Sequence, residues 1–314
     1  MSLRGACIAV TGATGFLGRY VVDALLARGA HVVAVVRNPG KAPELAAHGV
    51  ALRRADLAEP AALAAAFAGA DAVVSNAALL SLSHFRPADY LATNVQGTRH
   101  VFEAAARAGV RRAVHVSSAV VYAGRSGRAH REDDPLREAQ RVRPWNAYAI
   151  SKALSEREAW RLAAEHGIGL TTLRPDGIFG AFDENFMRVH KAFVRRRWLS
   201  AYPAFMLLPL VYAGDVAEAV ALALEQEVAV ERAYNVAGEA HTAWAFLRAW
   251  REAGGATPRL VLPVPAPLRR RLDSRRARAE LGWRTRPLVE GLRETLAAEA
   301  AGPAARRMTL GSAT

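Results

Sequence analysis

A glycine-rich turn near the start of the chain most narrows what this sequence can fold into. The segment VTGATGFLG, Val10–Gly18, lies between a short apolar run and a helical pattern. Gly12 permits a tight turn, Gly15 lets the backbone approach a pyrophosphate, and Gly18 lets the helix pack closely on the strand. Backbone amides at the positive end of that helix would then face the phosphates. The turn therefore predicts a βαβ unit that binds a dinucleotide.

Short apolar runs alternate with alanine-rich helical patterns through the first half of the chain. We predict strands at Cys7–Val10, His31–Val36, Val50–Arg53, Ala70–Ser75, Arg112–Val116 and Gly169–Leu173. Between them we predict helices at Leu17–Arg28, Pro60–Phe67, Tyr90–Ala108 and Asn146–His166. Continuous β-branched runs are typical of strands buried on both faces. The alternation indicates an α/β fold, a doubly wound parallel sheet of the Rossmann type.

The alternation weakens after Pro175, where a helix at Asp215–Glu225 and a strand at Arg232–Val236 lie among irregular segments. We expect a dinucleotide-binding Rossmann domain over residues 1–180, with residues 209–237 packing back on it. Residues 181–314 would then form mainly a small substrate-binding lobe and a C-terminal tail. Because no low-complexity linker separates the two parts, we expect one compact body.

Charge and cysteine content narrow the cellular setting and the partners. The net charge is +13, but the arginines are dispersed and no known nucleic-acid-binding module occurs, so we expect no nucleic-acid partner. The single cysteine, Cys7, permits no intrachain disulfide. The first apolar run is too short for a signal peptide, and the uncharged run Trp198–Gly214 is interrupted by Pro203 and Pro209. We therefore expect a cytoplasmic protein without membrane insertion.

The segment NAYAISK, Asn146–Lys152, places a lysine four residues after a tyrosine in a chain where all but three of the 42 basic residues are arginine. Residues four apart share one helix face, so an ordinary surface pair would have the same spacing. That spacing also sets an ammonium group one helical turn from a phenol. Because a nearby ammonium favours the phenolate, Tyr148 beside Lys152 is a candidate acid–base group.

Together these motifs resemble the short-chain dehydrogenase/reductase superfamily, in particular its extended, epimerase/dehydratase-like members. The resemblance extends from about Ala6 to Leu296 and rests on Thr11–Gly18, Asp56–Leu57, Asn76–Ala78, Asn94, Ser118, Tyr148–Lys152, Arg174–Pro175 and Ala279–Trp283. It implies a catalytic set formed by Ser118, Tyr148 and Lys152. It also implies a cofactor site formed by Gly12, Thr14, Gly15, Phe16, Leu17, Gly18, Arg37, Lys41, Asp56, Leu57, Asn76, Ala77, Ala78, Asn94, Tyr148, Lys152 and Pro175.

The resemblance also implies roles for these side chains. Tyr148 exchanges a proton with the substrate oxygen during hydride transfer, while Lys152 and the oxidised nicotinamide lower the pKa of the phenol. Lys152 also holds the nicotinamide ribose, and Ser118, preferred here over its neighbour Ser117, binds the substrate oxygen. Asn94 would link the lysine to a water chain, although a helix-bending structural role fits equally. Asp56 would contact the adenine, although a helix N-cap would look the same.

The end of the second predicted strand decides which dinucleotide binds. An acidic residue there accepts hydrogen bonds from the ribose hydroxyls of NAD, whereas a basic residue pairs with the 2′-phosphate of NADP. This chain has Val36 in place of the acid, followed by Arg37 and shortly afterwards by Lys41. An arginine fork suits a phosphate dianion, although Arg37 could be one more solvated arginine. We expect NADP(H), with NAD(H) as the second choice.

Three sequence features of other extended members are missing from this chain, and their absence narrows the reactions that it could catalyse. Ser118 is followed by Ala119 and Val120, not by the Asp-Glu pair of the nucleotide-sugar dehydratases. The segment Leu207–Leu210 stands where epimerases have an arginine for the substrate diphosphate, and the NAD-type acid is missing. An apolar wall from Tyr202 to Tyr212 suits a hydrophobic carbonyl substrate, although the same residues could be core packing.

We therefore predict an NADP(H)-dependent oxidoreductase that reduces the carbonyl, or oxidises the alcohol, of a small and mainly apolar substrate. The alternatives are a nucleotide-sugar epimerase or dehydratase with tightly bound NAD, and a non-catalytic regulator that senses a dinucleotide.

The nine histidines have no metal-ligand spacing, so we expect no metal site. Helices near Thr93–Ala108 and Asn146–His166 resemble those that pair in this family, which predicts a homodimer. The basic residues Arg188, Lys191 and Arg195–Arg197 could bind an anionic substrate group or remain solvated.

Overall fold

The computed structural model describes residues 1–80, 86–124, 128–138, 141–196, 198–265 and 269–302. Its centre is a seven-stranded sheet in the order β11-β6-β5-β4-β1-β2-β3, in which every neighbouring pair is parallel. The strands are β1 (Cys7–Thr11), β2 (His31–Val36), β3 (Ala51–Arg54), β4 (Ala72–Ser75), β5 (Arg112–Val116), β6 (Gly169–Pro175) and β11 (Arg232–Val236). This is the strand order of dinucleotide-binding doubly wound sheets. The predicted α/β Rossmann fold is confirmed.

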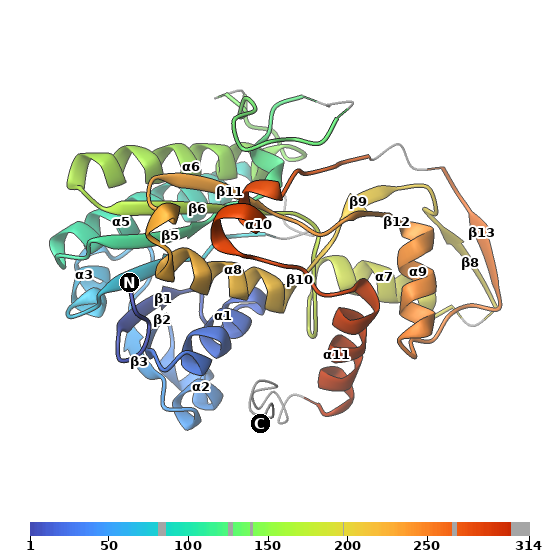
Figure 1. Ribbon diagram of the computed structural model, residues 1–314, viewed down its shortest axis with the longest axis horizontal. Helices are drawn as coiled ribbons and strands as arrows, with labels where there is room; N and C mark the ends of the chain where they lie inside the picture. Colours follow the sequence, from blue (N-terminus) through green and yellow to red (C-terminus); the bar gives the residue numbers. More distant parts are fainter. Residues whose placement is uncertain (81–85, 125–127, 139–140, 197, 266–268, 303–314) are drawn as a thin grey trace.

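Helices cover both faces of the sheet (Figure 1). One face carries α1 (Phe16–Ala27) and α8 (Ala213–Glu225), which pack against each other, and the other carries α3 (Pro60–Phe67), α5 (Gly97–Arg107) and α6 (Ala147–His166). Successive side chains of a strand point to opposite faces. Ile8 of β1 therefore joins the core beneath α1 and α8, while Ala9 joins the core beneath α3, α5 and α6. Burial on both faces explains why the strands are continuous apolar runs.

The helix expected at Tyr90–Ala108 is divided into three pieces. It begins with α4 (Pro87–Tyr90), continues as the π-helical segment η2 (Leu91–Gln96) and ends as α5. A π-helical turn inside a helix is uncommon and often lies at a functional site. The remaining short elements beside the sheet are η1 (Pro39–Lys41), α2 (Pro43–Ala47), η3 (Ala119–Val121) and η4 (Glu227–Ala229).

A smaller lobe lies beside one end of the sheet (Figure 1). It contains β7 (Ile178–Phe179), α7 (Phe186–Val194), β8 (Leu199–Tyr202), β9 (Leu207–Pro209), β10 (Val211–Tyr212), β12 (Ala240–Thr242), α9 (Ala243–Glu252), β13 (Leu260–Pro263) and α11 (Leu288–Ala300). Its core packs aromatic rings, including Phe179, Tyr212, Phe246 and Trp250. The uncharged run Trp198–Gly214 becomes three short strands of this lobe. No helix in the described part of the chain is long and apolar enough to span a membrane.

The chain passes between the two lobes more than once. After the first lobe segments, α8 packs on α1, and β11 pairs with β6 at the edge of the sheet. The later helix α10 (Arg275–Leu281) also packs against β11 and α8. Segments from the C-terminal half of the chain therefore pack against the sheet. Other segments of this half form one wall of a cavity at the carboxyl edge of the sheet.

Candidate active site and dinucleotide cradle

The glycine turn is built so tightly that it admits no side chain at two positions. Gly12 has a φ of +68°, in the left-handed region, and a Cβ added there would lie 2.8 Å from the Cα of Ala77. A Cβ added to Gly18 would lie 2.0 Å from the carbonyl oxygen of Gly12. Gly15 precedes α1 without any side-chain cap. The first amides of α1 are therefore open to an anion at the positive helix end.

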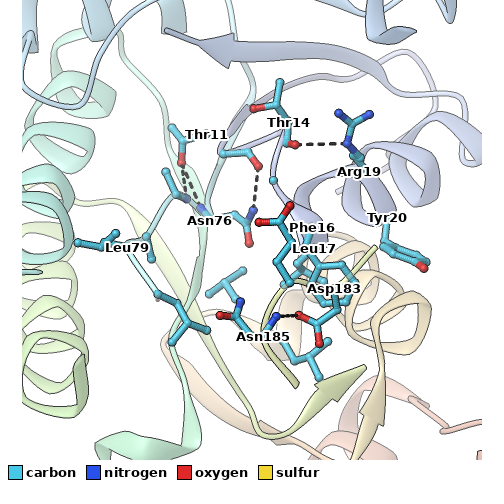
Figure 2. A pocket seen from close by; sticks show the side chains of 18 of the residues that line it. Thr11, Thr14, Phe16, Leu17, Arg19, Tyr20, Asn76, Leu79, Asp183 and Asn185 are labelled. Atoms are coloured by element: carbon cyan, nitrogen blue, oxygen red, sulfur yellow. Dashed lines mark hydrogen bonds between the residues drawn. The ribbon is translucent and has the colours of Figure 1, made fainter. Parts of the chain in front are cut away.

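Two polar side chains fix this turn to the neighbouring strand (Figure 2). The hydroxyl of Thr11 accepts hydrogen bonds from the backbone amides of Asn76 at 3.1 Å and Ala77 at 3.2 Å. The side-chain amide of Asn76 donates to the carbonyl of Gly12 at 3.4 Å. These contacts hold together the carboxyl ends of β1 and β4, the edge where open α/β sheets bind their ligands.

A cavity of about 960 Å³ runs along this edge of the sheet. Most of the predicted site residues line it: Gly12, Thr14, Gly15, Phe16, Leu17, Arg37, Asp56, Leu57, Asn76, Ala77, Ala78, Ser118, Tyr148, Lys152 and Pro175. Gly18, Lys41 and Asn94 do not line it. The opposite wall comes from the segment between β7 and α7, including Asp183 and Asn185, which lie across from the glycine turn in Figure 2.

The three predicted catalytic side chains reach this cavity from β5 and α6. Ser118 directly follows β5, and Tyr148 and Lys152 lie one turn apart near the start of α6. Ser118 forms a hydrogen bond with the phenol of Tyr148. Lys152 is buried, and its Nζ donates to the carbonyl of Val116 at 2.8 Å. One end of the cavity thus holds a phenol, a hydroxyl and an amine.

Burial controls the protonation of this group. Burial raises the pKa of Tyr148 to about 12, and the hydrogen bond from Ser118 offsets this only in part. Burial also lowers the pKa of Lys152 to about 8, although the carboxylate of Glu156 acts in the opposite direction. Desolvation of the phenol is the largest influence on its pKa, and the expectation that Lys152 together with the oxidised nicotinamide lowers that pKa stays a prediction. Tyr148 therefore holds its proton at neutral pH.

The side chain of Asn94 makes structural contacts and does not line the cavity, and its assignment to the cofactor site stays a prediction. Its Oδ1 accepts a hydrogen bond from the backbone amide of Leu79 at 2.6 Å. Its Nδ2 donates to the carbonyl of Leu79 at 3.1 Å and to the hydroxyl of Ser151 at 2.9 Å. Asn94 lies in the π-helical segment and fastens the loop after β4 to α6. Of the two roles considered for it, the structural one fits these contacts.

The end of β2 presents one basic side chain to the cavity. Arg37 is exposed, lines the cavity and pairs with no carboxylate among the described residues. Lys41 is exposed in η1 and does not line the cavity. Asp56 lines the cavity and accepts a hydrogen bond from the amide of Ala58 at 2.9 Å, but the N-cap of α3 is Glu59. Asp56 therefore caps a turn and not the helix.

A buried polar network next to the predicted catalytic residues was not foreseen from the sequence. Glu156, one helical turn after Lys152, pairs with Arg174 at 2.6 Å and accepts a hydrogen bond from Ser117. Arg174 also donates to the hydroxyl of Tyr122 at 2.9 Å, and that hydroxyl donates to Asn235 at 2.6 Å. The network ties α6 to β6 and β11. Both Ser117 and Ser118 line the cavity, but the hydroxyl of Ser117 donates its hydrogen bond to Glu156.

Comparison with known proteins identifies the family. The model of the NAD dependent epimerase/dehydratase family matches residues 8–237, which include the glycine turn, the predicted catalytic residues and the end of β11. The chain belongs to this family.

Relatives within the family carry different names. Sterol demethylase protein B of Methylococcus capsulatus is 33% identical over 284 residues, covering 85% of this chain and 83% of the relative. Cinnamoyl-CoA reductase 1 of Oryza sativa subsp. japonica is 32% identical over 262 residues, covering 78% and 75%. The solved UDP-glucose 4-epimerase of Thermus thermophilus, in complex with NAD, is 28% identical with a TM-score of 0.77, covering 94% and 99%. The epimerase/dehydratase family therefore fixes the architecture but leaves the reaction open.

The apolar segment from Tyr202 to Tyr212 supplies less of the cavity wall than its sequence suggested. Within this fully described segment, only Tyr212 lines the cavity. Tyr202 and Leu210 are buried in the core of the small lobe, and Phe205 is exposed. Core packing, the alternative considered from the sequence, holds for most of these residues. The wall beside the catalytic residues comes instead from the loop after β6, which begins with Asp176 and which no motif had indicated.

The basic residues of the small lobe do not form part of the cavity. Lys191 pairs with Glu299, while Arg188 and Arg195 are exposed. None of the three lines the cavity. Arg197 lies outside the described residues. For the described members of this group, a solvated or ion-paired surface position fits better than an anion site.

Proposed function

We propose that this family member is an NADP(H)-dependent oxidoreductase that reduces the carbonyl of a small substrate or oxidises the corresponding alcohol. The observation that carries the proposal is that Ser118, Tyr148 and Lys152 line the same cavity as the glycine turn. A proton donor and a dinucleotide cradle therefore share one space, as carbonyl reduction requires. The reductase name of a relative supports the same reaction class.

The cavity fits a nicotinamide dinucleotide. A Cβ on Gly15 would meet nothing closer than the carbonyl of Gly12 at 3.2 Å, so its absence leaves room beside the turn for a ligand. The uncapped start of α1 offers amide donors to a pyrophosphate. Asn76, Ala77 and Ala78 continue the cradle along the edge of the sheet. When bound, the nicotinamide would supply or accept the hydride, and a solved relative is described in complex with NAD.

The chain's own residues handle the proton. Tyr148 keeps its proton at neutral pH because burial raises its pKa, and it gives this proton to the oxygen of the reduced substrate. Ser118, which is hydrogen-bonded to the phenol, positions the substrate oxygen. Lys152, charged below about pH 8, favours the phenolate that remains and holds the cofactor ribose. General acid–base catalysis of this kind contributes about 10²–10⁴-fold in rate.

The preferred cofactor in this proposal is NADP(H). Val36 offers no carboxylate to a ribose hydroxyl, and Arg37 offers a guanidinium at the rim of the cavity that pairs with no described carboxylate. The register also places Arg54 of β3 beside Val36, but Arg54 pairs with Glu59 at 3.6 Å and does not line the cavity, so the preference rests on Arg37. A charge-assisted hydrogen bond to phosphate contributes about 1.5–3 kcal/mol, which corresponds to roughly ten- to a hundredfold in affinity.

A nucleotide-sugar epimerase with tightly bound NAD is the second candidate. It is kept because the Thermus thermophilus epimerase shares the fold over nearly all of both chains. Against it, the acid that NAD favours is absent at Val36, and Leu207 and Leu208 stand where an arginine is expected. A non-catalytic regulator is less favoured, because Tyr148 and Lys152 are both in place at the cavity.

The proposal extends to assembly and location. We place a homodimer interface on α5 and α6, which lie side by side on one face of the sheet. Light scattering at micromolar concentration should give twice the chain mass of 33.7 kDa, and a monomer alone would contradict the dimer. The single cysteine agrees with a reducing compartment such as the cytoplasm.

The reaction class is tested by a substrate screen. The purified protein is mixed with NADPH or NADH and with a panel of ketones, aldehydes and sugar nucleotides, and cofactor consumption is followed. We expect net consumption of NADPH with a ketone or aldehyde. Interconversion of a sugar nucleotide without net cofactor consumption would support the epimerase instead.

A further inference from the structure

A buried aspartate lies at the reacting end of the cavity and has no assigned role. Asp176 follows Pro175 at the end of β6, lines the cavity and is only 8% exposed. It is absent from the glycine turn, from the catalytic set and from the buried network beneath them. A carboxyl group is rarely buried unless it is paired or has a function. Its position therefore needs an explanation.

Only one of its two oxygens has a partner among the described residues. Oδ1 accepts a hydrogen bond from Nη1 of Arg270 at 2.7 Å. Oδ2 is buried and has no hydrogen-bond partner in the described part of the chain. An acceptor that is buried and unsatisfied costs about 1–3 kcal/mol. Because Asp176 lines the cavity, a ligand hydroxyl that reaches Oδ2 would remove this cost.

The pair lies at the end of the sheet that holds the predicted catalytic residues. Strand β6 pairs in parallel with β5, and Asp176 follows β6 in the same way that Ser118 follows β5. Burial is the main cause of the raised pKa of Tyr148, the charge of Asp176 raises it further and the charge of Arg270 lowers it. Asp176 and Tyr148 line the same cavity, so one bound substrate can extend from the phenol to the carboxylate.

We propose that Asp176, held by Arg270, accepts a hydrogen bond from a hydroxyl group of the substrate next to the reacting carbonyl. The inference rests on the proposed carbonyl reduction and narrows its substrate class to hydroxylated ketones or aldehydes. Such a substrate satisfies Oδ2, whereas a substrate with a methyl group in place of the hydroxyl leaves it buried and unpaired. Sites built around a hydrogen bond discriminate strongly against the analogue that lacks it.

Matched pairs of ketones test the inference. 2-Hydroxyacetophenone is compared with propiophenone, and 4-hydroxy-2-butanone with 2-pentanone, because each pair differs only by hydroxyl against methyl. In the wild type, kcat/KM for the hydroxyketone should exceed that of its partner by about tenfold or more in at least one pair, the scale of one satisfied hydrogen bond. Equal values in both pairs would overturn the inference and leave carbonyl reduction standing.

Variants test whether Asp176, and not another residue of the cavity, causes the preference for hydroxyketones. Asp176→Leu should abolish the preference, mainly by slowing the hydroxyketone, while Asp176→Asn retains an amide oxygen and part of the preference. Glu184→Gln is the matched control, because Glu184 is an exposed carboxylate that lines the same cavity. Thermal melts establish that each variant is folded. A full preference in Asp176→Leu would overturn the inference and would indicate that ordered water satisfies Oδ2.

A binding measurement keeps the two proposals distinguishable if no ketone is reduced. Calorimetric titration of the NADPH-loaded protein compares 1-phenyl-1,2-ethanediol with 1-phenyl-1-propanol, which requires no turnover. Tighter binding of the diol in the wild type but not in Asp176→Leu would support the aspartate site even if carbonyl reduction failed. Equal binding of the two alcohols, or no binding of either, would contradict it.

Discussion

The two ends of the cavity are built in different ways. The dinucleotide end is made of backbone from consecutive residues, in which Gly12, Gly15 and Gly18 shape the turn and Thr11 fixes it to β4. The reacting end is made of side chains from separate segments, such as Tyr148 of α6 and Asp176 after β6. Backbone geometry is specified by local spacing, whereas the side-chain assembly depends on how distant elements pack. We therefore expect substitutions at the two ends to separate cofactor binding from turnover.

Among the variants, Tyr148→Phe should separate turnover from cofactor affinity most strongly. Without the phenolic proton donor, turnover should fall by about 10²–10⁴-fold, while cofactor affinity stays near that of the wild type. Steady-state rates and a fluorescence titration with NADPH measure the two quantities. Tyr90→Phe is the matched control, because its ring packs edge-on against that of Tyr148 at 6.3 Å between ring centroids. Similar losses in both variants would point to packing and not to proton transfer.

Arg174→Met tests how much the buried pair of Arg174 and Glu156 stabilises the protein near the reacting end of the cavity. It leaves the fully buried carboxylate of Glu156 without its partner, and breaking such a pair costs about 3–5 kcal/mol of unfolding free energy. Chemical denaturation should show this loss. The double variant Arg174→Met/Glu156→Met should recover much of it, since a buried pair can be replaced by apolar side chains.

The control for this test is a surface pair on the same helix. Arg161 is 53% exposed and pairs with both Glu158 and Glu165, so Arg161→Met should cost only about 0–1 kcal/mol. If Arg174→Met were no more destabilising than Arg161→Met, the buried network would contribute little to the position of α6.

Arg37→Ala tests the dinucleotide end. The preference of the wild type for NADP over NAD should be about ten- to a hundredfold and should largely disappear in this variant, with turnover at saturating NADPH unchanged. Lys41→Ala should change the preference much less, because Lys41 does not line the cavity. Isothermal titration with both cofactors measures the ratio. Equal binding of NADP and NAD by the wild type would make Arg37 a surface residue and would favour the epimerase.

The smallest expected effect is the pH dependence of the reacting end. Because burial lowers the pKa of Lys152 to about 8, this lysine is charged below that pH and loses its charge above it. Turnover in the direction of reduction should therefore decline as the pH rises through about 8. Because the pKa of Tyr148 is raised to about 12, its ionisation should cause no second loss of turnover below that pH. Initial rates at saturating NADPH measure the profile, and a rate that stays constant well above pH 8 would contradict it.

The difference between the two ends also explains what could be predicted from the sequence. The fold followed from apolar runs and from the turn at Gly12–Gly18, because a parallel sheet buried on both faces leaves a continuous apolar pattern. The Tyr148–Lys152 pair was visible because one helical turn separates the two residues. Each of these signals is local in the chain, and the seven-stranded sheet bears out the fold.

The features that were missed depend on contacts between distant residues. Asp176 and Arg270 are 94 positions apart, and Glu156 meets Arg174 only when α6 packs on β6. Neither pair has a spacing that could be recognised in the chain. The role of Asn94 was left open because both interpretations require the same residue, and its contacts with Leu79 and Ser151 became known only from the structure.

The central claim is a net transfer of hydride to a substrate carbonyl with Tyr148 as the proton donor. The most direct measurement uses NADPH deuterated at C4, prepared as each of the two stereoisomers, with a ketone that the screen identifies. Mass spectrometry of the alcohol should find deuterium from one stereoisomer only, one label for each NADPH consumed, and Tyr148→Phe should remove nearly all of this product. An alcohol that is unlabelled with both stereoisomers, or a sugar nucleotide interconverted without loss of label from the cofactor, would contradict the account.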